Sequence, residues 1–128
     1  MREYRTLALR KFMSDYCKGI LEKRYVKAEL PRLPFDDKSF ELVLSGHFLF
    51  TYANKFDFDF HLSSILELFR VSRKEVRIYP LQQGMISKPY KQITELLSCL
   101  KKECIKYEII IVQFEFQKGS NKMLRLIH

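Results

Sequence analysis

The chain has 128 residues, 47% of them hydrophobic, with 7 Tyr and 11 Phe. This is enough apolar material for a single domain over residues 1–128 and argues against a disordered chain. The net charge of +8 suits a polyanionic partner such as nucleic acid, but no stripe combines the scattered basic residues with aromatic ones. No apolar run approaches the roughly 20 residues that span a bilayer, and the N-terminus lacks a secretory signal. We therefore expect a cytoplasmic protein without a membrane partner.

The N-terminal segment, residues 1–21, predicts a helix over 3–18. Four of its apolar residues recur at helical spacing: Tyr4, Ala8, Phe12 and Tyr16. Gly19 is a typical helix end. A short strand is expected over 25–29. Only ten residues, two of them proline, separate Glu29 from Phe40. Adjacent parallel strands need a crossover of about a dozen residues or more, so the strand at 25–29 and the next strand are not expected to be neighbours.

The next strand covers residues 40–45. Phe40, Leu42, Val43 and Leu44 form a nearly continuous apolar run, which is typical of a strand covered on both faces of a parallel sheet. Ser45, Gly46 and His47 follow at its carboxyl end, where open α/β sheets bind their ligands. His47 is therefore a candidate general base, with a structural histidine as the alternative.

The remaining elements alternate between strands and helices, which predicts the α/β class. An aromatic-rich loop over 48–60 is either core or the wall of a pocket. A helix over 58–72 precedes a strand over 75–79, and Ser87 with Pro89 predicts the start of a further helix. The last two strands, 107–117 and 122–127, meet at a Gly-Ser-Asn hairpin signal. Cys17, Cys99 and Cys104 lack ligand spacing, so neither a metal site nor a disulfide is expected.

Five segments in this order resemble class I S-adenosylmethionine-dependent methyltransferases: 28–35, 40–47, 66–71, 75–81 and 116–121. The resemblance covers about residues 22–128. It implies a partial Rossmann-like sheet, mostly parallel with a C-terminal antiparallel hairpin, and helices on both faces. The strand order of that family is 3-2-1-4-5-7-6. The strand at 25–29 would be the third and the strand at 40–45 the fourth, so the first and second strands lie outside this chain.

The resemblance also implies an S-adenosylmethionine site. Glu29 would accept a hydrogen bond from the adenine amino group, and Leu30 would supply the adjacent backbone N–H. Ser45 and Gly46 would line the floor near the transferred methyl group, with His47 as the base. The glycine-rich loop of the family is missing, because the four glycines are too far apart in the sequence to form it.

We therefore expect a truncated or split methyltransferase with an incomplete cofactor site. An N-terminal methyltransferase segment or a homo-oligomer would be its partner. One alternative is a non-catalytic interaction module that uses an open strand edge at 40–45. Another is a basic nucleic-acid-binding domain.

Overall fold

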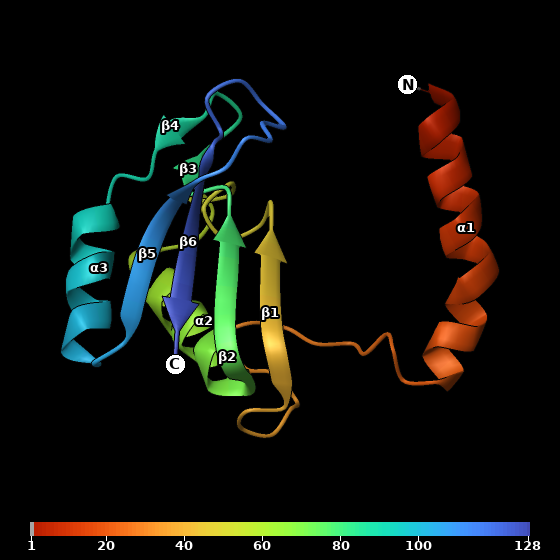
Figure 1. Cartoon of the computed structure of the whole chain (residues 1–128), viewed down its shortest axis with the longest axis horizontal. Coiled ribbons are helices and arrows are strands. Elements are labelled where there is room, and N and C mark those ends of the chain that lie inside the picture. The colour runs from red at the N-terminus through yellow and green to blue at the C-terminus, as the bar shows by residue number, and fades with distance from the viewer. Residues whose placement is uncertain (1) are drawn as a thin grey trace.

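A computed structural model describes residues 2–128 of the chain (Figure 1). Strands β1, β2, β6 and β5 form a four-stranded sheet in that order, and β3 pairs with β4 in a separate two-stranded ribbon. The elements are α1 (Arg2–Leu21), β1 (Phe40–Gly46), α2 (Phe58–Val71), β2 (Ser72–Tyr79), β3 (Gln82–Gln83), β4 (Lys88–Pro89), α3 (Ile93–Lys102), β5 (Lys106–Ile111) and β6 (Lys122–Ile127). The predicted α/β class is confirmed.

The sheet contains one parallel and two antiparallel pairs of neighbours. β1 and β2 are parallel, whereas β6 is antiparallel to both β2 and β5. The prediction of a mostly parallel sheet was therefore wrong. The reason is that β6 lies between β2 and β5 and runs opposite to both, so two of the three neighbouring pairs are antiparallel.

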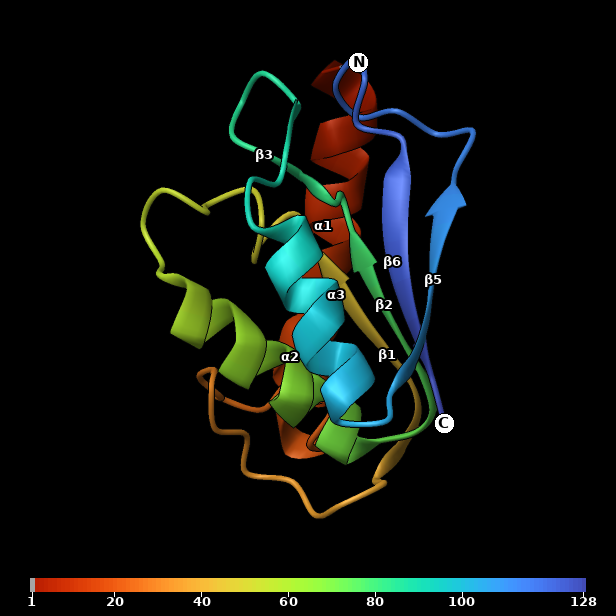
Figure 2. The same cartoon turned by 90° about the vertical axis from the view of Figure 1, so that its left-hand side faces the viewer.

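The hydrophobic core lies on one face of the sheet, beneath α2 and α3 (Figure 2). α2 begins where Asp57 accepts a hydrogen bond from the Phe60 N–H over 2.8 Å, as expected of an N-cap. The buried side chains come from both helices and the two central strands: Ile65, Leu68, Leu96, Leu100, Val76, Ile78, Leu124 and Leu126. Both helices that pack on the sheet lie on this face (Figure 2). For the described residues, the prediction of helices on both faces was wrong.

The opposite face of the sheet carries charged side chains. Because Val76 and Ile78 point into the core, their neighbours in β2 point the other way. Glu75 pairs with Arg77 over 2.8 Å and also with Arg125 of β6. Arg125 reaches Glu108 of β5 over 3.1 Å. This row of ion pairs leaves the face polar across its centre.

β1 is an edge strand, and its apolar side chains are exposed. Leu42 and Leu44 are 44% and 68% exposed, and Phe40 is also exposed. Val43 packs at the margin of the core. The sequence pattern predicted cover on both faces of this strand, and that prediction was wrong for the described residues because no element covers the face that carries Leu42 and Leu44.

α1 extends two residues past Gly19 to Leu21. Gly19 is helical, and the ring of Tyr25 packs so closely against it that a Cβ there would lie 2.2 Å from that ring. Tyr25 also contacts Phe12 and Tyr16, with ring centroids 5.7 and 5.4 Å apart. The predicted strand over 25–29 is therefore absent. Tyr25 turns back onto α1, and only an isolated bridge joins Glu29 to Arg32.

Other boundaries differ in ways that local packing explains. α3 begins at Ile93 rather than near Ser87, because Lys88–Pro89 pairs with Gln82–Gln83 in the small ribbon. β5 ends at Ile111, and a loop over 112–121 replaces the tight hairpin before β6. In the aromatic loop Phe50 is buried, whereas Phe48 and Tyr52 are exposed.

Candidate binding site at the carboxyl end of the parallel strands

The carboxyl ends of β1 and β2 lie side by side and place His47 at the rim of the sheet. Gly46 pairs with Tyr79, and the His47 N–H donates to the Tyr79 carbonyl over 2.8 Å. His47 itself has a φ of 53°, in the left-handed region that few non-glycine residues adopt. Strand pairing therefore holds the backbone up to His47, where the chain turns away and leaves the imidazole exposed.

Tyr79 connects this rim to the loop over 112–121. Its hydroxyl lies 2.6 Å from the Ser120 carbonyl, to which it donates, and it accepts a hydrogen bond from the Phe116 N–H over 3.3 Å. Phe114 and Phe116 are 65% and 62% exposed. A single hydroxyl thus holds an exposed aromatic loop beside the strand ends.

His47, Tyr79, Phe114 and Phe116 form what we call the rim cluster. The ring centroid of His47 lies 5.3 Å from that of Tyr79 and 4.9 Å from that of Phe116, both in edge-on arrangements. Exposed rings around one imidazole can hold an apolar or planar ligand next to a group that accepts a proton. Sequence reasoning found His47 but missed the three other residues.

The structure does not bring Glu29 and Leu30 together with Ser45 and Gly46. Leu30 packs against the core, and Glu29 is exposed. The segment that follows them is tied to the C-terminal half of α2, where Glu67 accepts a hydrogen bond from the Leu33 N–H over 2.8 Å. The next turn of the chain leads into the amino end of β1, whereas Ser45 and Gly46 lie at its carboxyl end.

Glu67 and Arg70 fix that segment electrostatically. Arg70 donates to both carboxylate oxygens of Glu67 over 2.7 and 2.8 Å. The Arg70 hydrogen bonds, aided by the one from Leu33, lower the pKa of Glu67 to about 2. Arg70 also pairs with Asp37 over 2.7 Å. These contacts anchor the entry to β1 and do not form a ligand site.

A second histidine, His61, is buried under the aromatic loop. Its Nδ1 atom is hydrogen-bonded to the Tyr90 hydroxyl over 2.8 Å, and Phe50 packs against both rings. Burial lowers the pKa of His61 and raises that of Tyr90 to about 12. Both groups are therefore neutral near pH 7 and join α2 to the segment before α3 as part of the core.

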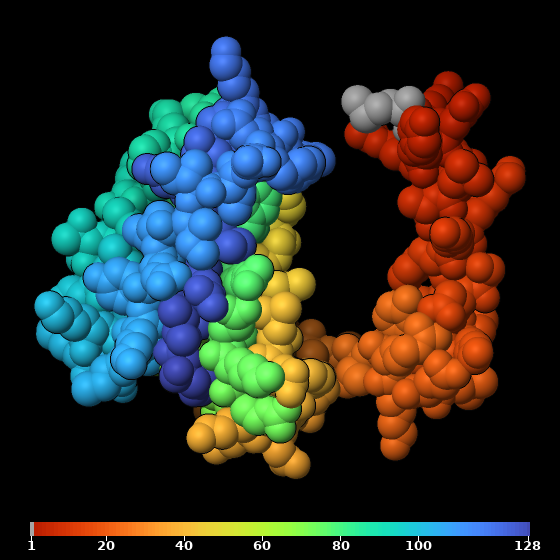
Figure 3. All heavy atoms as spheres, in the orientation of Figure 1, coloured from red at the N-terminus to blue at the C-terminus, as the bar shows by residue number. Residues whose placement is uncertain are grey.

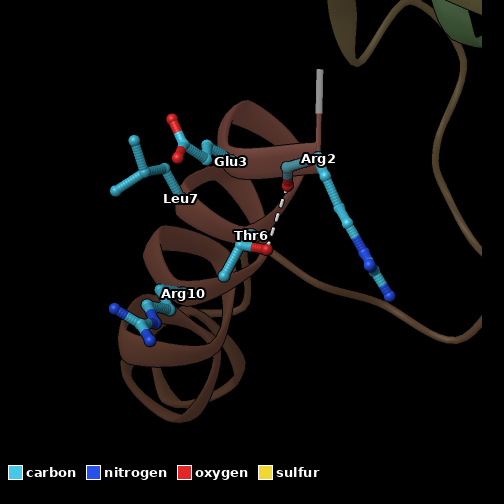
Figure 4. A pocket seen from close by; sticks show the side chains of 5 residues that line it. All are labelled: Arg2, Glu3, Thr6, Leu7 and Arg10. Atoms are coloured by element: carbon cyan, nitrogen blue, oxygen red, sulfur yellow. Dashed lines mark hydrogen bonds between the residues drawn. The ribbon is translucent and has the colours of Figure 1, made fainter.

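Two hollows on the surface are large enough to hold a small ligand. One, of about 370 Å³, lies between the loop over 51–55 and the small ribbon, and has Lys55 and Lys88 on its wall. The other, of about 450 Å³, lies on α1. Figure 4 shows that the side chains lining it project from one helix and do not converge, so nothing there would hold a ligand.

Residues 2–128 contain neither a cluster of metal ligands nor a helix suited to a membrane. No three His, Cys, Asp or Glu side chains gather in that range as a metal site would require. No helix in it is long and apolar enough to span a bilayer.

Comparison with known proteins finds a relative of this chain. No family model matches this chain. The chain is 37% identical over 123 residues to the uncharacterized protein MJ0045 of Methanocaldococcus jannaschii. The match covers 96% of this chain and 49% of the relative. The chain thus spans about half the length of the curated relative that it matches.

Proposed function

We propose that this chain is part of an S-adenosylmethionine-dependent methyltransferase whose cofactor site is completed by a further polypeptide segment. The strand order supports the proposal. The order β1-β2-β6-β5, with β6 antiparallel to both neighbours, is the order of the fourth, fifth, seventh and sixth strands in the Rossmann-like class I fold. Successive βα units alone place parallel strands side by side, so an antiparallel strand inserted between β2 and β5 is a specific feature.

In this proposal the rim cluster lies where methyl transfer would occur. Backbone groups of Ser45 and Gly46 would border the cofactor, and His47 would accept the proton that the acceptor loses. Phe114 and Phe116 would contact an apolar part of the acceptor. Glu29 and Leu30 would reach the adenine only if the segment over 22–33 moved when the further segment bound.

The chain by itself is not expected to transfer methyl groups. Transfer requires the sulfonium carbon to be held in line with the attacking atom, and the glycine-rich loop that would hold the cofactor is missing from the sequence. The acceptor and cofactor would therefore meet in productive geometry only in the completed protein.

Calorimetric titration with S-adenosylmethionine and S-adenosylhomocysteine tests the proposal. We expect no binding to the chain alone at millimolar cofactor, and micromolar binding once the completing segment is present. Micromolar binding to the chain alone would overturn the inference that its cofactor site is incomplete. A completed protein that binds no cofactor would overturn the proposal that it is a methyltransferase. In the completed protein, His47→Ala should leave cofactor affinity unchanged and lower the transfer rate about a hundredfold or more.

The open edge of β1 favours a second candidate, a non-catalytic interaction module. An apolar edge strand is a template for pairing with another chain, whether or not the resulting complex binds a cofactor. A stable complex through β1 that never binds S-adenosylmethionine would favour this candidate over the enzyme.

A further inference from the structure

β1 has no neighbour on one side within the described residues, although its composition suits a paired strand. It pairs with β2 alone, and the backbone groups of its other edge are open over Phe40–Gly46. Seven residues make an edge about 23 Å long at roughly 3.3 Å per residue. Edge strands are usually protected by lysine, proline or a covering element. The sequence of β1 contains neither lysine nor proline.

α1 carries further exposed apolar side chains, which are distributed around the helix rather than along one face. Its large apolar side chains are exposed along its length: Tyr4, Leu7, Leu9, Phe12, Met13, Tyr16, Ile20 and Leu21. Packing with Tyr25 and the ion pair between Arg24 and Asp15, 2.6 Å long, tie the helix to its own linker. Figure 3 shows open space between α1 and the sheet. Most helices gain their stability by packing an apolar face, and within residues 2–128 the rings of Phe12 and Tyr16 in α1 pack against Tyr25 of the linker.

We propose that the space between α1 and β1 is a docking surface for an α/β polypeptide segment. The segment would add a strand to the open edge of β1 and pack its other side against the apolar residues of α1. Side chains of the incoming segment would also cover Leu42 and Leu44. The inference rests on the proposed function in one respect, because the same segment would complete the cofactor site.

The comparison with the M. jannaschii relative indicates which segment fits. This chain matches 49% of that relative, so the relative contains about as much additional chain as the described domain. A second copy of this chain fits less well, because it would bring together two chains that each carry a net charge of +8, which opposes association.

Co-expression of the chain with the unmatched part of the relative tests the inference. We expect a complex with one copy of each by light scattering, and slowed amide hydrogen exchange in β1 and α1. Leu44→Lys should weaken the complex at least tenfold, because it places a charge beside the new strand. Ile111→Lys is the matched control, since Ile111 is 72% exposed on the other edge strand, β5, and it should leave the affinity unchanged.

Several outcomes would overturn the docking surface. The first is that the chain stays monomeric and its β1 amides exchange freely. The second is that both lysine variants weaken the complex equally. The third is that the chain associates with itself through β1. Circular dichroism of the variants confirms that each is folded. Calorimetry with S-adenosylmethionine separates this inference from the proposed function. A complex that forms but binds no cofactor would support the docking surface and contradict the methyltransferase proposal. Cofactor binding without complex formation would contradict the docking surface and leave the methyltransferase proposal standing.

Discussion

Glu67 offers a direct test of how the chain enters β1. Its carboxylate accepts hydrogen bonds from Arg70 of the same helix and from the Leu33 N–H, 34 residues earlier in the chain. Glu67→Gln removes the charge but keeps an oxygen that can accept the hydrogen bond of Leu33. The substitution therefore isolates the electrostatic part of this contact.

The pKa of Glu67 sets the expected magnitude. It falls from 4.5 to about 2, first because Arg70 donates to the carboxylate. At about 1.4 kcal/mol per tenfold change in proton affinity, the full effect would be about 3.4 kcal/mol. The Arg70 side chain is 34% exposed, so solvent screening reduces this to about 1–2 kcal/mol. We expect Glu67→Gln to lower the free energy of unfolding by that amount at pH 7.

The pH dependence has a definite sign. A carboxyl group whose pKa is lower in the folded protein stabilises the fold above its unfolded pKa, here about 4.5. That stabilisation is lost as the pH falls through about 2. The difference in unfolding free energy between wild type and Glu67→Gln should therefore be largest at pH 7 and should shrink between pH 4.5 and pH 2.

Urea denaturation followed by circular dichroism at pH 7, 4.5 and 3 measures this difference. Asp37→Asn is the matched control, because Asp37 pairs with the same arginine but its side chain is 76% exposed. It should cost less than about 0.5 kcal/mol. The reasoning is refuted if Glu67→Gln costs nothing at pH 7, or if its cost is the same at pH 3 as at pH 7.

Three further predictions concern the rim cluster and the buried histidine. Tyr79→Phe removes the hydroxyl that holds the loop over 112–121 and should cost about 1 kcal/mol, with faster hydrogen exchange at Phe116. Tyr107→Phe is its control and should change neither. Tyr90→Phe leaves the buried His61 Nδ1 without its partner and should cost about 1–3 kcal/mol in urea unfolding. Burial lowers the pKa of His61, so stability should fall as the pH drops below about 6.5. An NMR titration that finds His61 protonating at or above that pH would contradict this.

Elements whose signals are local were predictable from the sequence. α2 is the clearest case, since the sequence predicted a helix over 58–72 and the helix covers Phe58–Val71. The start of α3 was not predictable in this way. Ser87 and Pro89 have the composition of a helix start, but pairing between β3 and β4 competes for the same residues. Pairing with residues seven and five places earlier decided where the helix begins.

The candidate site shows the same division. The end of β1 and the position of His47 just beyond it followed from the change from apolar to small and polar residues, and its role as a base stays a prediction. The other members of the rim cluster could not be found, because Tyr79 and Phe116 meet His47 across 32 and 69 residues of chain. Their contact depends on the inserted position of β6 and on the hydroxyl of Tyr79, neither of which has a local sequence signal.

The most informative disagreement between sequence and structure is the burial of β1. Phe40 to Leu44 has the composition of a strand covered on both faces, yet Leu44 is 68% exposed and the strand lies at an edge. In the central strands composition and burial agree, as at Val76 and Leu124, whereas Ile111 of the other edge strand, β5, is exposed like Leu44. If the sequence pattern had simply been misread, the residues on the exposed face of β1 would be polar, and they are not. The composition of β1 therefore fits the docking surface proposed above, in which an incoming segment would cover Leu42 and Leu44 and lie against α1.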